Sequence, residues 1–96
     1  MPVQYTGIID EHNTVRTACG LFDVSHMGEV AVTGPNALDF LQMIVTNDVS
    51  RIKDRQAIYS PMCYASGTIV DDLIIYRKAA DSFFIIVNAS NADKDF

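Results

Sequence analysis

The sequence predicts an α+β domain built on a mostly antiparallel sheet with flanking helices. Four segments have the length and alternation of strands, and three carry helix signals. The last three strands follow one another through short turns, as antiparallel neighbours do. Hydrophobic residues make up 49% of the chain and charged residues 20%, values typical of a folded globular domain.

In the first half, Gly7 to Cys19 carries an apolar stripe at helical spacing, and Gly20 supplies a stop. Leu21 to Val24 is predicted to be a short extended piece, and Glu29 to Thr33 alternates as a strand. Gly34-Pro35 is expected to open a second helix, with proline at its first position. The buried stripe of that helix is predicted to be Ala37, Leu38, Leu41, Ile44 and Val45, with Phe40 at its margin.

In the second half, three further strands are expected, separated by turns at Ala65–Gly67 and Lys78–Asp81. They span Ala57 to about Tyr64, Thr68 to Arg77, and Phe83 to Asn88. A last helix should be capped by Ser90 or Asn91, with Asp93 in its first turn.

Composition excludes several classes of protein. The formal charge of −5 argues against nucleic-acid binding, which needs clustered lysine and arginine. No apolar run reaches membrane-spanning length, and no secretory signal precedes the first helix. Two cysteines without metal-type spacing are expected to be reduced thiols, so a cytoplasmic location is expected and no metal site is predicted.

The most informative feature is the pair Asp71-Asp72 inside a run that otherwise resembles a buried strand. Alternation places Asp72 with Ile74 and Tyr76 on one face and Asp71 on the other. Both faces are largely apolar, so we expect both to be covered and at least one carboxylate to leave water, which is costly without hydrogen-bond donors or a ligand. Opposite faces disfavour chelation of one cation by the pair. The residues alone leave two readings: both aspartates bond neighbouring amides, or Asp72 belongs to a site.

Asp72 and Tyr76 would lie about 13 Å apart along an extended strand. That separation suits a carboxylate and an aromatic ring that touch different parts of one elongated, ring-containing ligand.

Several motifs together resemble one family. They are Leu21-Phe-Asp-Val-Ser-His-Met-Gly-Glu29, Thr46-Asn-Asp48, Gly67 to Tyr76 (GTIVDDLIIY), Val87-Asn-Ala-Ser-Asn91 and Lys94-Asp-Phe96. In this order and spacing they resemble the glycine cleavage system T protein, the tetrahydrofolate-dependent aminomethyltransferase. The resemblance implies the N-terminal folate-binding part of that fold.

The resemblance also implies an activity. The family transfers a one-carbon unit from the aminomethyl-lipoyl arm of the H protein to tetrahydrofolate, with release of ammonia, as part of glycine catabolism. The second aspartate of its DD motif acts at the folate and matches Asp72, which would be the catalytic residue. The residues that match positions lining the folate pocket are Met27, Tyr59, Asp72, Tyr76 and Asn88.

One register prediction follows from this set. If Asn88 shares the pocket, it should lie across from Asp72, which makes the connection from Lys78 to Ser82 a short odd-numbered loop. If Asn88 instead opposes Asp71, it leaves the list of site residues.

The family's chain is much longer, so residues 1–96 are expected to form a single partial domain with both ends truncated. Such a piece should be inactive by itself, because pterin contacts open to water lose preorganisation. Its exposed apolar faces and strand edges predict self-association. The alternatives are a fragment of a related folate-dependent demethylase (sarcosine or dimethylglycine type), separable by dependence on the H protein, and a non-catalytic folate-binding or structural module.

Overall fold

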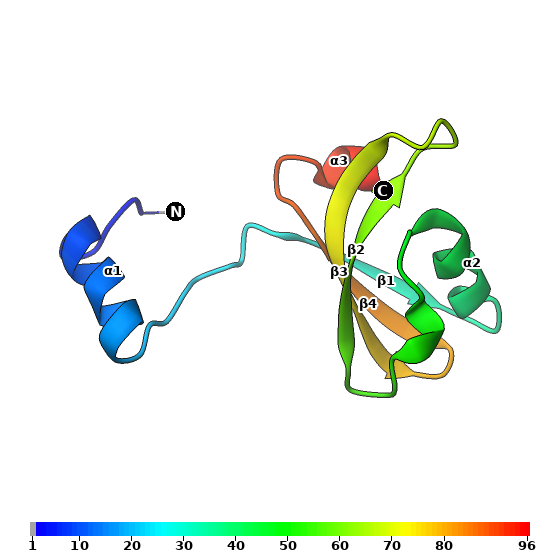
Figure 1. Ribbon diagram of the computed structural model, residues 1–96, viewed down its shortest axis with the longest axis horizontal. Coiled ribbons are helices and arrows are strands. Elements are labelled where there is room, and N and C mark those ends of the chain that lie inside the picture. The colour runs from blue at the N-terminus through cyan, green and yellow to red at the C-terminus, as the bar shows by residue number, and fades with distance from the viewer. Residues whose placement is uncertain (1) are drawn as a thin grey trace.

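The computed structural model describes residues 2–96 and contains the predicted order of elements. Figure 1 labels them along the chain. They are α1 (Ile8–Thr17), β1 (Gly28–Thr33), α2 (Ala37–Ile44), the 3₁₀ helix η1 (Val49–Arg51), β2 (Ala57–Cys63), β3 (Ile69–Ala79), β4 (Ser82–Val87) and α3 (Ala92–Asp95). The α+β class is confirmed, and η1 is the element that the sequence pattern did not predict.

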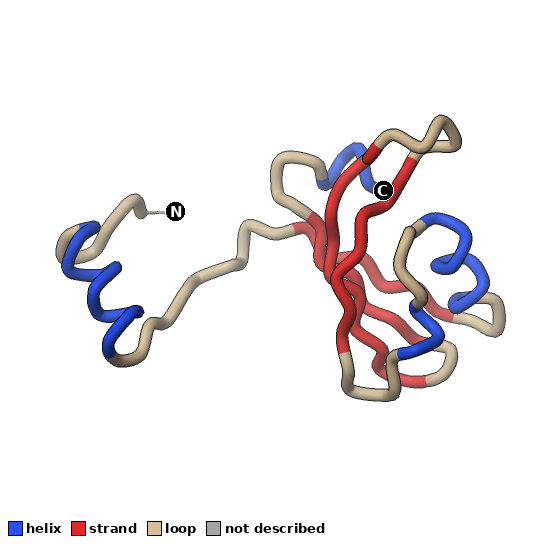
Figure 2. The backbone as a smooth tube through the Cα atoms, in the orientation of Figure 1, coloured by secondary structure: helices blue, strands red, loops and turns tan. Residues whose placement is uncertain are grey.

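The four strands form one antiparallel sheet in the order β1-β4-β3-β2. The central strands β3 and β4 are joined by a tight turn, with a register shift between Arg77 and Ala79. Strand β1 comes early in the chain but pairs with β4, from Gly28 opposite Val87 to Thr33 opposite Ser82. The first strand therefore closes one edge of a sheet made mainly by the second half of the chain (Figure 2).

One face of the sheet is covered by α2 and η1, and the hydrophobic core lies there. Alternate residues of β3 and β4, among them Leu73, Ile75 and Phe83, pack against Leu41 of α2 and Val49 of η1. The stripe predicted for α2 is confirmed: Ala37, Leu41 and Val45 are buried, and Leu38 and Ile44 pack against the core. Burial of one such side chain stabilises the fold by about 1.5–3 kcal/mol.

The other face of the sheet, which we call the open face, is not covered by any helix among residues 2–96. The expectation that both faces of β3 are covered is therefore wrong for this chain. The physical reason is that α2, η1 and α3 all contact the side of the sheet that carries Leu73 and Ile75. The open face comprises Glu29, Ala31, Thr33, Ala57, Tyr59, Pro61, Asp72, Ile74, Tyr76, Phe84 and Ile86.

Helix α1 stands apart from the sheet, joined to β1 by an extended segment (Figure 1). The predicted helix is confirmed, but none of its residues is buried. The segment Leu21–Val24 pairs with no strand, because it spans the distance between α1 and the sheet, and Leu21 is fully exposed.

Helix α2 begins two residues later than its proline signal predicted. Pro35 lies in a turn closed by a hydrogen bond from the Ala37 amide to the Gly34 carbonyl (3.0 Å), and Asn36 is the N-cap. Proline suits such a turn because its fixed φ matches the second turn position. The predicted start of the helix at Pro35 is therefore wrong, because Pro35 belongs to the turn that precedes α2.

Candidate functional site

Three of the predicted site residues meet around the carboxylate of Asp72. The Tyr59 hydroxyl donates to Asp72 Oδ2 (3.0 Å), and Asn88 Nδ2 donates to Asp72 Oδ1 (3.1 Å). Hydrogen bonds to an ionised acceptor are about twice as strong as those between neutral groups. An exposed carboxylate is thus held in a fixed direction by side chains from β2 and from the segment after β4.

Strand register produces this meeting. Pro61 lies opposite Asp72 and Tyr59 lies opposite Ile74, so Tyr59 is a diagonal neighbour of Asp72 on the open face. The β3–β4 pairs end at Ile74 opposite Ile86, and the same register continued by two residues puts Asn88 opposite Asp72. A hydrogen bond from Asn88 Nδ2 to the Asp72 carbonyl (3.0 Å) agrees with that continuation. The predicted position of Asn88 across from Asp72 therefore agrees with the register, but the predicted odd-numbered connection is wrong. Two residues, Ala80 and Asp81, separate β3 from β4, because a register shift between Arg77 and Ala79 places an extra residue in β3.

The remaining two predicted residues lie on the same side. Tyr76 shares the open face of β3 with Asp72 and is 42% exposed. Met27 directly precedes β1, and the pairing of Gly28 with Val87, continued by one residue, brings Met27 beside Asn88. The row across the sheet therefore runs from Met27 through Asn88 to Asp72, with Tyr76 further along β3.

Tyr59 is kept in its neutral, donating form. Its hydrogen bond to Asp72 raises the pKa of the Tyr59 phenol, and partial loss of solvent and the negative charges of Asp72 and Asp71 raise it further. At neutral pH the phenol is a permanent donor to Asp72.

Asp71, the neighbour of Asp72, is buried on the covered side and only 4% exposed. Its Oδ1 accepts from Asn88 Nδ2 (2.9 Å) and Asn91 Nδ2 (2.8 Å), and its Oδ2 accepts from the Asn88 amide (3.1 Å). Desolvation raises the pKa of Asp71, but hydrogen bonds from Asn88, Asn91 and Asp95 outweigh it and hold that pKa well below the usual range. The first reading of the aspartate pair, bonding to nearby amides, holds for Asp71.

Asp95 is a second carboxyl that sequence reasoning missed. Both of its oxygens are buried, and as a carboxylate it has no hydrogen-bond donor among the described residues. Desolvation, a hydrogen bond with Asp71 and the charge of Asp71 raise the pKa of Asp95 to about 6, against the lowering effect of Lys94. A protonated carboxyl can donate, so the neutral form of Asp95 suits a buried position beside Asp71. The signal available in the sequence was the spacing Asn91-Ala-Asp-Lys-Asp95 directly after a strand.

The loop Thr46-Asn47-Asp48 supports the strand that carries Tyr59. Asn47 Nδ2 donates to the Tyr59 carbonyl (3.0 Å), and the Asn47 amide donates to the hydroxyl of Ser60 (2.9 Å), which is fully buried. Asp48 Oδ1 accepts from the Ser50 amide (3.0 Å), which starts η1. This loop therefore fixes β2 beside the site without contributing a side chain to it.

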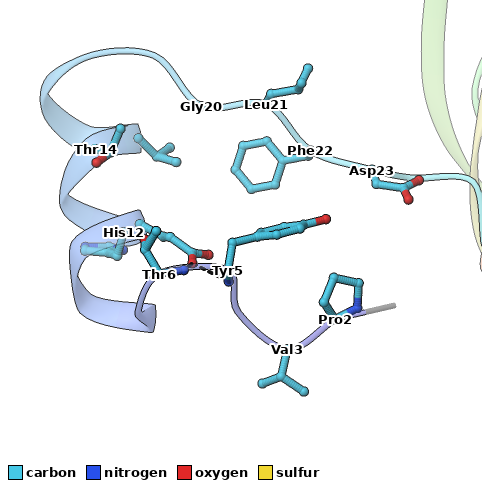
Figure 3. Close-up of a pocket in the computed structure, with 12 residues that line it drawn as sticks. Pro2, Val3, Tyr5, Thr6, His12, Thr14, Gly20, Leu21, Phe22 and Asp23 are labelled. Carbon is cyan, nitrogen blue, oxygen red and sulfur yellow. Dashed lines mark hydrogen bonds between the residues drawn. The ribbon is translucent and has the colours of Figure 1, made fainter.

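A hollow of about 520 Å³ lies far from these residues, between α1 and the chain on either side of it (Figure 3). Tyr5, Leu21 and Phe22 line it, and none of the five predicted site residues does. Its lining residue Glu11 is partly exposed and binds the chain that precedes the helix: Oε1 accepts from the amides of Tyr5 (2.6 Å) and Thr6 (2.7 Å), and these backbone bonds lower the pKa of Glu11. The hollow mixes apolar side chains with polar ones, His12 and Asp23 among them.

Among residues 2–96, no group of three or more histidine, cysteine, aspartate or glutamate side chains is placed to hold a metal ion. Within the same described range, no helix has the length and apolar character needed to cross a bilayer.

The chain is similar to known aminomethyltransferases. It is 67% identical to "Aminomethyltransferase" of Chlorobium chlorochromatii and 60% identical to that of Desulfitobacterium hafniense, in each case over all 96 residues and 26% of the relative. It therefore spans about a quarter of the length of these relatives.

A solved structure agrees with the sequence matches. The crystal structure of glycine cleavage system aminomethyltransferase T from Bartonella henselae superposes with a TM-score of 0.73 at 41% identity, over 78% of this chain and 21% of that one. The family model described as GCVT N-terminal domain matches residues 1–96. The chain therefore belongs to the GCVT N-terminal domain family, with aminomethyltransferases as its relatives.

Proposed function

We propose that this chain supplies part of the tetrahydrofolate site of a glycine cleavage T protein. The reaction moves the one-carbon unit of aminomethyl-lipoyl H protein to tetrahydrofolate. The products are methylenetetrahydrofolate, ammonia and dihydrolipoyl H protein. The observation that carries the proposal is the Asp72 carboxylate, directed by Tyr59 and Asn88 on an exposed sheet face beside Tyr76.

The site suits the pterin end of folate because its free groups are acceptors and aromatic surfaces. Each Asp72 oxygen accepts one bond from the protein and keeps a lone pair for a ligand N–H. Tyr59 and Tyr76 offer ring surface on the same face, 57% and 42% exposed. We infer that Asp72 orients the pterin and holds charge at its reacting nitrogens, while Met27 and Tyr76 fix the ring.

A chimera tests this proposal in a complete enzyme. Residues 1–96 replace the matching segment of the Chlorobium chlorochromatii aminomethyltransferase, to which they are 67% identical. The chimera should form methylenetetrahydrofolate only when aminomethylated H protein is supplied. One-carbon transfer from sarcosine or dimethylglycine without H protein would favour the demethylase alternative instead.

The isolated 96-residue chain should show neither turnover nor strong folate binding, since its site is open to water. Calorimetric titration of the chain with tetrahydrofolate should give no measurable heat of specific binding. Methylenetetrahydrofolate formation by the isolated chain would contradict this part of the proposal.

A further inference from the structure

Three N–H groups from one short segment converge on the buried carboxylate of Asp71. Two belong to Asn88, through its backbone amide (3.1 Å) and Nδ2 (2.9 Å), and the third is Asn91 Nδ2 (2.8 Å). The segment that follows β4 is therefore anchored to β3 by a side chain and not by strand pairing. Asp71 decides where Asn88 sits relative to Asp72.

The same contacts decide which way the Asn88 amide faces. Its Nδ2 lies near three oxygens: Asp71 Oδ1 (2.9 Å), the Asp72 carbonyl (3.0 Å) and Asp72 Oδ1 (3.1 Å). Rotating the amide by half a turn would place its carbonyl oxygen against these three acceptors, so one orientation is strongly favoured. Both N–H donors are occupied, and the Oδ1 acceptor is left for a ligand.

Asp95 is a titratable residue that neighbours Asp71, the residue that anchors Asn88. The residues around it in the groove between α2, α3 and the sheet are apolar, among them Phe40, Leu73 and Val87. The charged groups that reach Asp95 are Asp71 from β3 and Lys94 from α3, and the Lys94 ammonium also donates to the Val70 carbonyl (2.7 Å). When Asp95 loses its proton, Asp71 loses a donor and gains a negative neighbour.

We propose that Asp71 is a positioning residue for the Asp72 site: through Asn88, it holds an amide on the open face with the carbonyl oxygen available to a ligand. The consequence of this positioning for catalysis rests on the proposed function. The effect of Asp71 on Asn88 does not depend on that function. Asp71 touches no ligand; it acts through Asn88, and the protonation state of Asp95 changes how tightly Asn88 is held.

The direct test follows the Asn88 side-chain NH₂ by NMR in the ¹⁵N-labelled 96-residue chain between pH 4.5 and 8. Its two protons should stay slow to exchange with solvent, and their shifts should change with a midpoint near that of Asp95. Asp71→Asn should at least halve the shift separation of the two protons and raise their exchange rate at least 10-fold. Asp95→Asn should abolish the change of these shifts with pH, while the two Asn88 side-chain protons stay slow to exchange. Asp93→Asn, the same change on an exposed residue of α3, is the matched control and should do neither.

The second arm uses the chimera with tetrahydrofolate as the probe. Asp71→Asn should lower kcat/KM for tetrahydrofolate at least 10-fold, and Asp93→Asn should leave it within 2-fold. An Asn88 amide unaffected by both Asp71→Asn and Asp95→Asn would overturn the positioning role. If Asp71→Asn unfolds the chain, the unmodified chain still provides a test. An Asn88 side-chain amide whose shifts do not change with pH in that chain would also overturn the positioning role. A chimera insensitive to Asp72→Asn, with Asn88 responding as described, would instead refute the proposed function alone.

Discussion

Asp71 and Asp72 are consecutive residues, yet they lie on opposite faces of β3 and meet the same side chain, Asn88. Asp71 Oδ1 and Asp72 Oδ1 accept from Asn88 Nδ2 at 2.9 and 3.1 Å. Asp71 is 4% exposed, whereas Asp72 is open to solvent. Asn88 therefore links a buried anchor to an exposed acceptor across the end of the sheet.

The bond between Tyr59 and Asp72 should be visible in a phenol titration. Because Asp72 raises the pKa of Tyr59, part of the ultraviolet absorbance change of phenol ionisation should occur above the ordinary phenol pKa. The stabilisation from this bond is present below the ordinary phenol pKa and is lost as pH rises through the raised value. Asp72→Asn should shift that late transition to lower pH. An unchanged titration would show that the two side chains do not interact in solution.

Because of the pair Asp71–Asp95, the free energy of unfolding should be greatest at mildly acidic pH. The folded pKa of Asp95 lies above its ordinary value of 3.8, at about 6, so its contribution grows as pH falls through 6 and is complete below 3.8. One group contributes a slope of at most about 1.4 kcal/mol per pH unit. Asp71 has a lowered pKa, so its contribution to stability has the opposite pH dependence. That contribution is present above pH 3.8 and is lost in stronger acid.

Urea unfolding at several pH values should therefore show the free energy of unfolding rising from pH 7.5 to 4.5. Asp95→Asn should flatten this rise, and Asp93→Asn should preserve it. A rise of equal slope in both variants would assign the effect to other groups.

Gly28 is required by the approach of α3. A Cβ at this position would lie 2.6 Å from Val87 Cγ2 and 2.9 Å from Ala92 Cβ, so Gly28→Ala must displace the short helix or the strand. Such overpacking costs about 1–3 kcal/mol. Urea denaturation should show that loss, while Glu29→Ala, one residue further on the exposed side, should change stability by less than about 0.5 kcal/mol.

The open face predicts self-association of the isolated chain. Ile74, Phe84 and Ile86 form an apolar strip at its centre, and such uncovered apolar strips drive association. Light scattering should show a mass that increases with concentration. Ile74→Glu should reduce the association, whereas Lys78→Glu on an exposed position outside the strip should not. A monomer at all concentrations would contradict this prediction.

The sequence pattern was sufficient for the order of the elements and the α2 stripe, because these depend on local periodicity. The position of Asn88 across from Asp72 was expected only from the resemblance, and counting along the strands missed the register shift between Arg77 and Ala79. The pattern did not predict that one face of β3 is open. Apolar residues on a strand indicate that burial of that face is favourable, but they do not show whether residues of this chain bury it. It also missed Asp95, since a carboxyl in a short helix resembles ordinary capping until its buried position beside Asp71 is known.

The most direct test of the account is Asp72→Asn in the chimera that carries residues 1–96 in the Chlorobium chlorochromatii aminomethyltransferase. The substitution keeps the size of the side chain and removes its charge, so folding should be retained. The rate of H-protein-dependent methylenetetrahydrofolate formation should fall at least about 100-fold, the contribution typical of a positioned proton-handling group. Turnover equal to that of the unmodified chimera would contradict the account and leave Asp72 as a structural residue of the sheet.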